Sequence, residues 1–239
     1  ASQLASEEEI ESAYEKAFIA CDNYIALHPH ETQGHLSKNF LLRTYADWKE
    51  EPISQEAYDL IDIIFEQSPE RTEGYAALAY LYLTDNEYEK AAETISIAYE
   101  LSGDRQPAIL WLYAVLHHTI TGDAATYAPI GYRAIQYGIV IKNPVNALWI
   151  ADYYIEQNNL QIVMDIYERL IEMYPASPQF LPNLIATYAE LGYYDEARRN
   201  AETLRILDPA QSEAIDAFLA SLPEKSMKYE TSYSPTSLV

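Results

Sequence analysis

The chain has 239 residues and a formal net charge of −22, from 15 basic and 37 acidic side chains. Apolar residues make up 49% of it, which is too large a share for a disordered chain. The charge repels phosphate backbones, which argues against nucleic-acid binding. No apolar run approaches the ~18 residues of a membrane span, and a single cysteine excludes an intrachain disulfide. Seven glycines are few for a turn-rich β fold and favour an all-α fold.

Residues 1–29 are predicted to form one long helix, a half-unit that caps the N-terminal end. Cys21 falls on the apolar face of this helix, so we expect a buried, structural thiol. The chain starts with Ala1-Ser2-Gln3, as a signal-peptidase product does, and a domain cut from a larger protein would start in the same way. We therefore expect an extracytoplasmic location (secreted, periplasmic or at the cell surface) and leave a cytoplasmic one open.

The next segment is predicted to be a long connection followed by a helix pair. His28, His30 and His35 fall in the connection. Three histidines within eight residues could hold a divalent metal, but a polar loop lengthened by six residues is the favoured interpretation. We therefore predict no metal, cofactor or catalytic site. The first helix of the pair is placed by residues at helical spacing: Leu41, Thr44, Tyr45 and Trp48.

A clearer helix pair is predicted between residues 75 and 103. Asp85-Asn86 makes the turn between its two helices. Both helices carry small and apolar residues at the spacing of a buried face: Tyr75, Leu78, Ala79 and Tyr82 on the first, then Ala91, Ile95 and Ala98 on the second. The small alanines let the two helices approach closely, and the tyrosines are expected to fill the gap to the next pair.

The unit at about 107–143 departs from this pattern. It keeps Tyr113-Ala114 but has a three-residue insertion, and Pro129 and Gly131 are expected to interrupt its second helix. His117 takes the place of a tyrosine in other units, so a core-packing role is expected. The adjacent His118 points to a different face of the helix, so the two cannot share a metal ion.

One short motif recurs through the whole array. Tyr14-Glu15-Lys16-Ala17 returns at 88–91 and at 194–197, with weaker copies at 54–57 and 160–163. The intervals are 40, 34, 72 and 34 residues, and 72 is two units of 36. A period near 34 is typical of the helix–turn–helix unit of tetratricopeptide repeats. Over roughly residues 10–222 the chain resembles that family.

The resemblance implies an all-α solenoid, a right-handed superhelix of about five helix pairs between capping helices. The solenoid would span residues 1–222, with 211–222 as its C-terminal cap and 223–239 as a polar, Ser/Thr-rich tail. In this family the first helix of each pair lines a concave groove. By register, the predicted partner-binding groove is lined by Tyr80, Leu83, Trp111, Leu112, Val115, Leu148, Trp149 and Asp152.

This predicted groove is apolar and aromatic, as protein interfaces are. Family members that bind the acidic C-termini of chaperones use a ring of Lys, Arg and Asn. This sequence has Arg43 and Asn183 but no such ring, so we exclude that activity. We predict a non-enzymatic scaffold for an apolar or aromatic segment of a protein partner or of another copy of itself. The tail is predicted to dock on its own solenoid or on a neighbour through four apolar residues: Tyr229, Tyr233, Leu238 and Val239.

Two alternative functions stay open at this point. Tail exchange between copies would make the chain a subunit of an extracellular or cell-surface filament, because head-to-tail contacts propagate unless they close. The unit at 192–197 is also loosely similar to repeat segments of bacterial membrane enzymes that build surface polysaccharide, which would make the chain a periplasmic accessory domain of such an enzyme.

Overall fold

The computed structural model describes residues 5–224, and the predicted docking residues Tyr229, Tyr233, Leu238 and Val239 lie outside this range. Within it the chain is all-α, and no described residue belongs to a strand. No helix among the described residues is both long enough and apolar enough to cross a membrane. The chain divides into two compact units, Ala1–Asp123 and Ala124–Val239. The division falls inside the irregular repeat predicted at 107–143.

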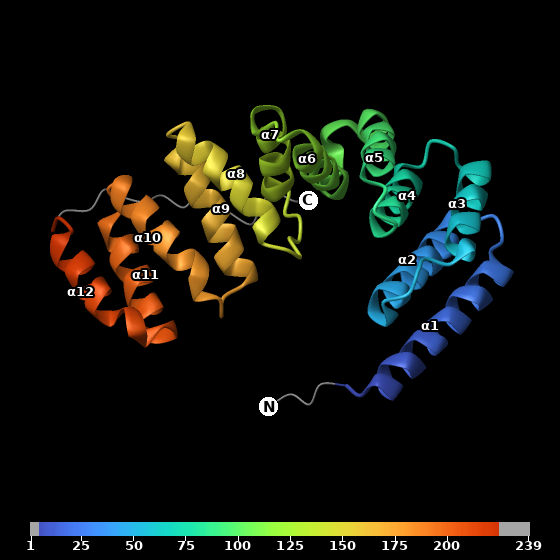
Figure 1. The fold of residues 1–239 in the computed structure, drawn as a ribbon, viewed down its shortest axis with the longest axis horizontal. Helices are drawn as coiled ribbons and strands as arrows, with labels where there is room; N and C mark the ends of the chain where they lie inside the picture. The colour runs from blue at the N-terminus through green and yellow to red at the C-terminus, as the bar shows by residue number, and fades with distance from the viewer. Residues whose placement is uncertain (1–4, 225–239) are drawn as a thin grey trace. The chain divides into compact units, whose positions relative to one another are not determined.

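From residue 5 onward, unit 1 contains six α-helices, each packed against the next along the chain (Figure 1). The second and fourth helices also contact each other, as the first helices of successive repeats should. The helices are α1 (Glu7–Leu27), α2 (Thr32–Lys49), α3 (Gln55–Gln67), α4 (Thr72–Thr84), α5 (Tyr88–Ser102) and α6 (Pro107–Thr121).

The first helix begins where its sequence allows a full cap. The Ser6 hydroxyl accepts a hydrogen bond from the Glu9 backbone N–H at 3.2 Å, and the Glu9 carboxylate accepts one from the Ser6 N–H at 2.7 Å. This capping box satisfies two backbone donors that the helix itself cannot. The helix α1 packs extensively on one neighbour, α2. None of its residues is therefore fully buried.

Small side chains set the distance between the helices of unit 1. The helix pair α4–α5 closes over Ala79, Ala91 and Ala98, which are fully buried together with Ile95. Isoleucines and leucines from neighbouring helices fill the rest of this cluster. Of the predicted buried face, the four residues named above are fully buried, whereas Tyr75, Leu78 and Tyr82 are partly buried. Close packing of this kind is what stabilises a repeat that cannot bury its apolar face alone.

Two glycines mark where one repeat meets the next. A Cβ atom on Gly34 would lie 2.8 Å from Tyr24 Cδ1 and 2.9 Å from Ile25 Cγ1, and one on Gly74 would lie 3.0 Å from Phe65 Cε1. At both positions side chains of the preceding helix therefore lie directly against the glycine of a first helix. The two sites are 40 residues apart and share the sequence Thr-x-Gly at the helix start.

This register corrects the prediction for the first helix pair. The helix begins at Thr32, so His35 lies inside α2 and not in a connection with His28 and His30. Five of the six extra residues lengthen the helix at its C-terminal end, which runs on to Lys49, and the sixth lies in the connection that follows. In the resulting alignment, shifted by 40, Phe40 is the counterpart of Tyr80.

Polar side chains tie the repeats of unit 1 together at recurring positions. Arg71, which precedes α4, donates to the hydroxyl of the buried Thr32, and Gln106, which precedes α6, donates to that of Thr72 at 2.8 Å. Each tie joins the start of one first helix to the start of the preceding first helix. These threonines satisfy their hydroxyl groups inside the packed array, as buried polar groups must.

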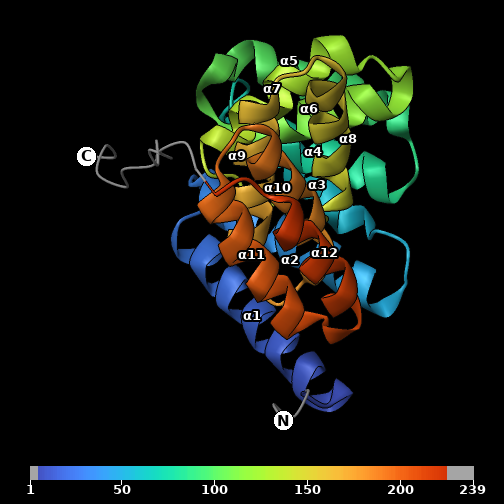
Figure 2. The same cartoon turned by 90° about the vertical axis from the view of Figure 1, so that its left-hand side faces the viewer.

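Up to residue 224, unit 2 also contains six α-helices, and it has a buried core of its own. Neighbouring helices pack in chain order, and both views show α11 beside α12 (Figure 2). The helices are α7 (Ala124–Gln136), α8 (Val145–Glu156), α9 (Leu160–Met173), α10 (Leu181–Glu190), α11 (Tyr194–Leu207) and α12 (Ser212–Ser221). The last of these, α12, lies within residues 211–222, where a helix is predicted, and its role as the C-terminal cap stays a prediction.

The prediction that Pro129 and Gly131 interrupt a helix is wrong. Both lie inside the continuous helix α7, in which Gly131 and the following residue, Tyr132, are buried. A proline removes one backbone hydrogen bond from a helix interior. The burial of Ala128, Ala134 and Ile135 on the same helix offsets that loss.

Tyrosines link different helices of the same unit through their hydroxyl groups as well as their rings. Tyr132 donates to Asp165 at 2.7 Å, Tyr58 donates to Asp85, and Tyr188 donates to Glu168. Burial, reinforced by the neighbouring carboxylate, raises the pKa of Tyr58 and Tyr132 above the usual tyrosine range. The predicted role of the tyrosines in packing between repeats is therefore seen in both units.

Candidate interaction surfaces

An arginine stacked on two aromatic rings lies on the first helices of unit 1. The Arg43 guanidinium carbon is 4.5 Å from the ring centroid of Tyr80 on α4 and 5.4 Å from that of Phe40 on its own helix. Phe40 is 48% exposed, although it is a large apolar residue. Among the described residues Arg43 forms no hydrogen bond or ion pair, so its planar group can still receive a partner's carboxylate or aromatic ring.

Four of the predicted groove residues lie on the first helices α4 and α6 of the same unit. Tyr80 and Leu83 are partly buried and pack on the α4–α5–α6 core, and Trp111 and Val115 of α6 are also partly buried. Burial raises the pKa of the Tyr80 hydroxyl, and the positive charge of Arg43 opposes that shift. We call the resulting set the first-helix face of unit 1: Phe40, Arg43, Tyr80, Leu83, Trp111 and Val115.

Leu112 does not belong to this face. It is 5% exposed and forms part of the core with Leu116 and Ile109. Its side chain therefore has little surface left for a partner. Sequence reasoning assigned it by register, and the register could not tell which of two adjacent residues, Trp111 or Leu112, turns inward.

Unit 2 carries the remaining predicted residues on α8. Leu148 and Trp149 are partly buried, and Asp152 is exposed one turn further on. Ile155 is exposed on the same helix. On α10, the exposed Asn183 donates a hydrogen bond to the Tyr167 hydroxyl at 2.8 Å, so its amide is already used within the unit.

The surroundings of the histidines and of the cysteine do not form a metal site or a reactive thiol among the described residues. The described residues contain no group of three His, Cys, Asp or Glu side chains that could hold a metal ion. His28 and His30 are exposed, and His35 is buried. Cys21 is half-buried, not buried as expected, because α1 has a neighbouring helix on one side only. Burial, with the charge of Asp22 adding to it, raises the pKa of its thiol, which disfavours the reactive thiolate.

A hollow of about 560 Å³ lies between α5 and α6 within unit 1. We call it the α5–α6 hollow. Sequence reasoning missed it, because it placed the binding surface on the first helices alone. It is lined by Glu89, Ala92, Glu93, Ser96, Ile97 and Glu100 of α5 and by His117 and Ile120 of α6.

Ser96 and His117 meet in this hollow, with the serine hydroxyl oxygen 2.9 Å from His117 Nε2. Serine–histidine pairs can be catalytic when the histidine accepts the hydroxyl proton. Here Ser96 donates that proton to the Ala92 carbonyl at 2.7 Å, which leaves the imidazole as the donor of the pair. Burial lowers the pKa of His117, which favours the uncharged ring at neutral pH. The histidine therefore does not accept the serine proton in this arrangement, and we interpret the pair as a structural hydrogen bond between α5 and α6.

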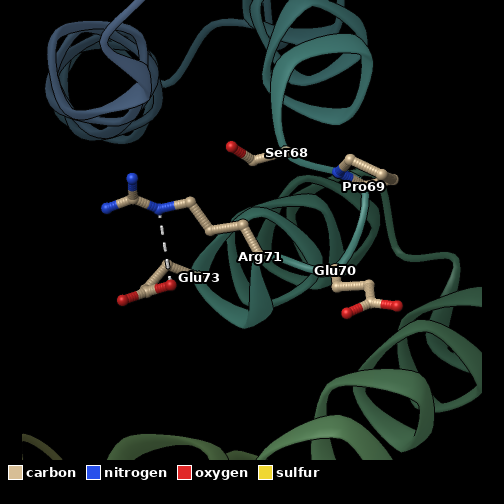
Figure 3. Close-up of a pocket in the computed structure, with 5 residues that line it drawn as sticks. All are labelled: Ser68, Pro69, Glu70, Arg71 and Glu73. Atoms are coloured by element: carbon tan, nitrogen blue, oxygen red, sulfur yellow. Dashed lines mark ion pairs between the residues drawn. The ribbon is translucent and has the colours of Figure 1, made fainter.

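A second hollow, of about 500 Å³, lies where α3 connects to α4. Figure 3 shows Arg71 directed toward Glu73, with 3.4 Å between Nε and the carboxylate, while Glu70 points away. Arg71 also donates to Gln33 at 3.1 Å, in addition to Thr32. Its donors thus tie the repeats together, and we interpret this hollow as a feature of the connection.

The helix order and the repeat ties define a tetratricopeptide-like fold, and comparison with solved structures agrees. The chain is similar to YrrB, described as a tetratricopeptide repeat protein with an unusual peptide-binding site (14% identity, TM-score 0.51, 83% of this chain and 97% of that one). It is also similar to PilF of Pseudomonas aeruginosa (14% identity, TM-score 0.58, 88% of this chain and 90% of that one). A third similar structure is BtubC of P. vanneervenii (14% identity, TM-score 0.50, 93% of this chain and 97% of that one).

At such identities the similarity concerns the fold. The predicted all-α solenoid class and the predicted resemblance to tetratricopeptide repeats are confirmed at that level. No protein-family model and no curated protein matches the sequence.

Proposed function

We propose that this protein is a non-enzymatic interaction scaffold, and that the first-helix face of unit 1 binds a protein segment with aromatic or apolar anchors. One observation carries the proposal: the guanidinium of Arg43 lies between the exposed ring of Phe40 and the partly buried ring of Tyr80. Aromatic residues and arginine are the types enriched at the energetic centres of interfaces.

The stack offers a partner two kinds of contact at one place. The ring of Phe40 supplies apolar area that is uncovered in the isolated chain. The unpaired donors of Arg43 supply a site for a carboxylate, in a chain whose net charge of −22 otherwise repels anions. A segment with an aromatic side chain next to an acidic residue or a C-terminus would use both.

The similarity to YrrB supports a peptide as the partner, because that protein is described as having a peptide-binding site on the same fold. The fold alone does not determine function. The proposal therefore depends on the residues of the face, and Trp149 and Leu148 of α8 are assigned the same role within unit 2.

The test is a selection of binding peptides from a random peptide library, followed by measurement of dissociation constants with the full chain. Replacing Phe40→Ala or Trp111→Ala should weaken the strongest peptides about tenfold or more, as removal of an interface anchor does. Trp149→Ala tests the face of unit 2 in the same way. The matched control is Tyr88→Ala, which removes an exposed aromatic residue from the second helix α5.

Unchanged binding in both unit 1 variants, with a helical circular dichroism signal equal to that of the parent, would remove this face from consideration. Equal loss in Tyr88→Ala would show that the peptides bind exposed aromatic residues without selecting a site.

A further inference from the structure

The α5–α6 hollow is a second surface, separate from the first-helix face, that is uncovered in the isolated chain. Two aliphatic side chains stand open on facing helices: Ile97 of α5 is 44% exposed and Ile120 of α6 is 41% exposed. Exposed isoleucines at the mouth of a hollow leave apolar surface in water at a cost of roughly 25 cal/mol per Å². A partner that covers both would recover that free energy.

Three carboxylates line the hollow together with these isoleucines, and all three belong to α5. Glu89, Glu93 and Glu100 line the hollow, and none of the three forms an ion pair with any described residue. No lysine or arginine is among the residues that line it. His117 does not supply a balancing charge at neutral pH, because its burial favours the uncharged imidazole. The hollow therefore combines exposed isoleucines with uncompensated negative charge along α5.

The spacing of these groups suits several separate cations better than a single one. Glu89 and Glu100 are eleven residues apart on α5, which is about 16 Å along the helix axis. Metal binding needs carboxylates that converge, and no such group of three exists among the described residues. Phosphate-bearing partners such as nucleic acids and anionic lipid surfaces would be repelled. A polypeptide with several basic side chains remains as the occupant.

We propose that the α5–α6 hollow binds a basic amphipathic helical segment of a protein partner, about three turns long, laid along α5. Its aliphatic side chains would cover Ile97 and Ile120, and its lysines or arginines would face Glu89, Glu93 and Glu100. Residues on one face of such a helix recur every three or four positions, as do Glu89, Glu93, Ile97 and Glu100 themselves. The basic side chains of the partner would thereby form ion pairs with three glutamates that have no such pairs within the described part of the chain.

The experiment uses the full chain and a defined probe. The probe is a fluorescein-labelled peptide of about 14 residues, with leucines at amphipathic helical spacing and lysines elsewhere. A second peptide carries glutamates in place of the lysines. Fluorescence anisotropy should show saturable binding of the basic peptide and no binding of the acidic one, and hydrogen exchange should slow within residues 88–121 on binding.

Variants separate this site from the general negative charge. The triple variant Glu89→Gln, Glu93→Gln, Glu100→Gln should weaken binding about tenfold. The control triple Asp62→Asn, Glu66→Gln, Glu70→Gln removes as many exposed, unpaired carboxylates from around α3 and should change binding less than about twofold. Ile97→Ser keeps every charge and should also weaken binding, by more than the roughly twofold limit set for the control triple.

Three results would overturn the proposal: equal losses in the two triple variants, unchanged binding in Ile97→Ser, or equal binding of the acidic peptide. A dimer in light scattering that the first triple variant dissociates would also overturn it, because the occupant would then be a second copy. Phe40→Ala should leave the basic peptide unaffected, so failure here and failure of the first-helix face are distinguishable.

Discussion

His35 buries two imidazole nitrogens for which the described residues offer no hydrogen-bond partner. The side chain is 4% exposed, and an unsatisfied buried polar atom costs stability. In the next repeat the same position holds Tyr75, whose hydroxyl donates to the Pro69 carbonyl at 2.9 Å. Pro29 is the counterpart of Pro69 in the 40-residue register.

The substitution His35→Tyr should therefore stabilise unit 1. The new hydroxyl would reach the Pro29 carbonyl and no unsatisfied nitrogen would remain, which is worth about 1 kcal/mol in the free energy of unfolding. Urea denaturation followed by circular dichroism measures the change. His30→Tyr, at an exposed position, is the control and should have no effect. A loss of stability in His35→Tyr would mean that the site is too small or holds a water molecule.

At the scale of the helix, Gly34 determines how closely α2 approaches α1. An added Cβ would lie within 2.9 Å of two side-chain carbons, so neighbouring groups must shift. Alanine also favours a helix over glycine by roughly 0.8–1.0 kcal/mol, which opposes this cost. We expect Gly34→Ala to lower the free energy of unfolding by about 1 kcal/mol net.

Gly74→Ala is the matched comparison for this prediction. The same contacts there are longer, at 3.0 and 3.1 Å, so its loss of stability should be smaller than that of Gly34→Ala. Chemical denaturation of the two variants in parallel gives the ranking. If both were more stable than the parent chain, the preference of alanine for the helix would outweigh the close approach.

The repeat architecture could be predicted because alanine and tyrosine positions recur at a near-constant period, and the structure buries Ala79, Ala91 and Ala98 as that pattern requires. The first repeat was misaligned by six residues, since the motif Tyr-Glu-Lys-Ala marks second helices and says nothing of how long a first helix is. Phe40 was missed for this reason. The recurrence of Thr-x-Gly at residues 32 and 72 was the signal that could have found it.

The continuity of α7 and the α5–α6 hollow could not be predicted from the same pattern. Whether a helix survives Pro129 depends on how much of it is buried by its neighbours, which is a tertiary quantity. The hollow depends on how side chains of two different helices meet, as Ser96 of α5 and His117 of α6 do although they are 21 residues apart in sequence. Periodicity identifies the buried face of each helix and leaves the shape of the opposite surface undetermined.

At the scale of the whole molecule, acidic side chains far outnumber the basic groups that could neutralise them. Several bases already contact two acids each: Lys38 lies 2.6 Å from Asp22 and 2.5 Å from Glu56. Burial disfavours the charged form of Lys38, but hydrogen bonds to both carboxylates outweigh it and raise its pKa. With such pairs formed, the formal excess is still 37 − 15 = 22 negative charges. Mutual repulsion of these charges should destabilise the compact state.

Added salt should therefore stabilise this protein. Raising sodium chloride from about 0.01 M to about 1 M shortens the screening length from roughly 30 Å to 3 Å, which removes long-range repulsion but weakens exposed ion pairs as well. Because repulsion involves all 22 excess charges, we expect Tm, measured by circular dichroism at pH 7, to rise with salt. The triple variant Glu89→Gln, Glu93→Gln, Glu100→Gln has fewer repelling charges and should show a smaller rise. A Tm that falls with salt in the parent chain would show that ion pairs such as those of Lys38 contribute more to stability than repulsion removes.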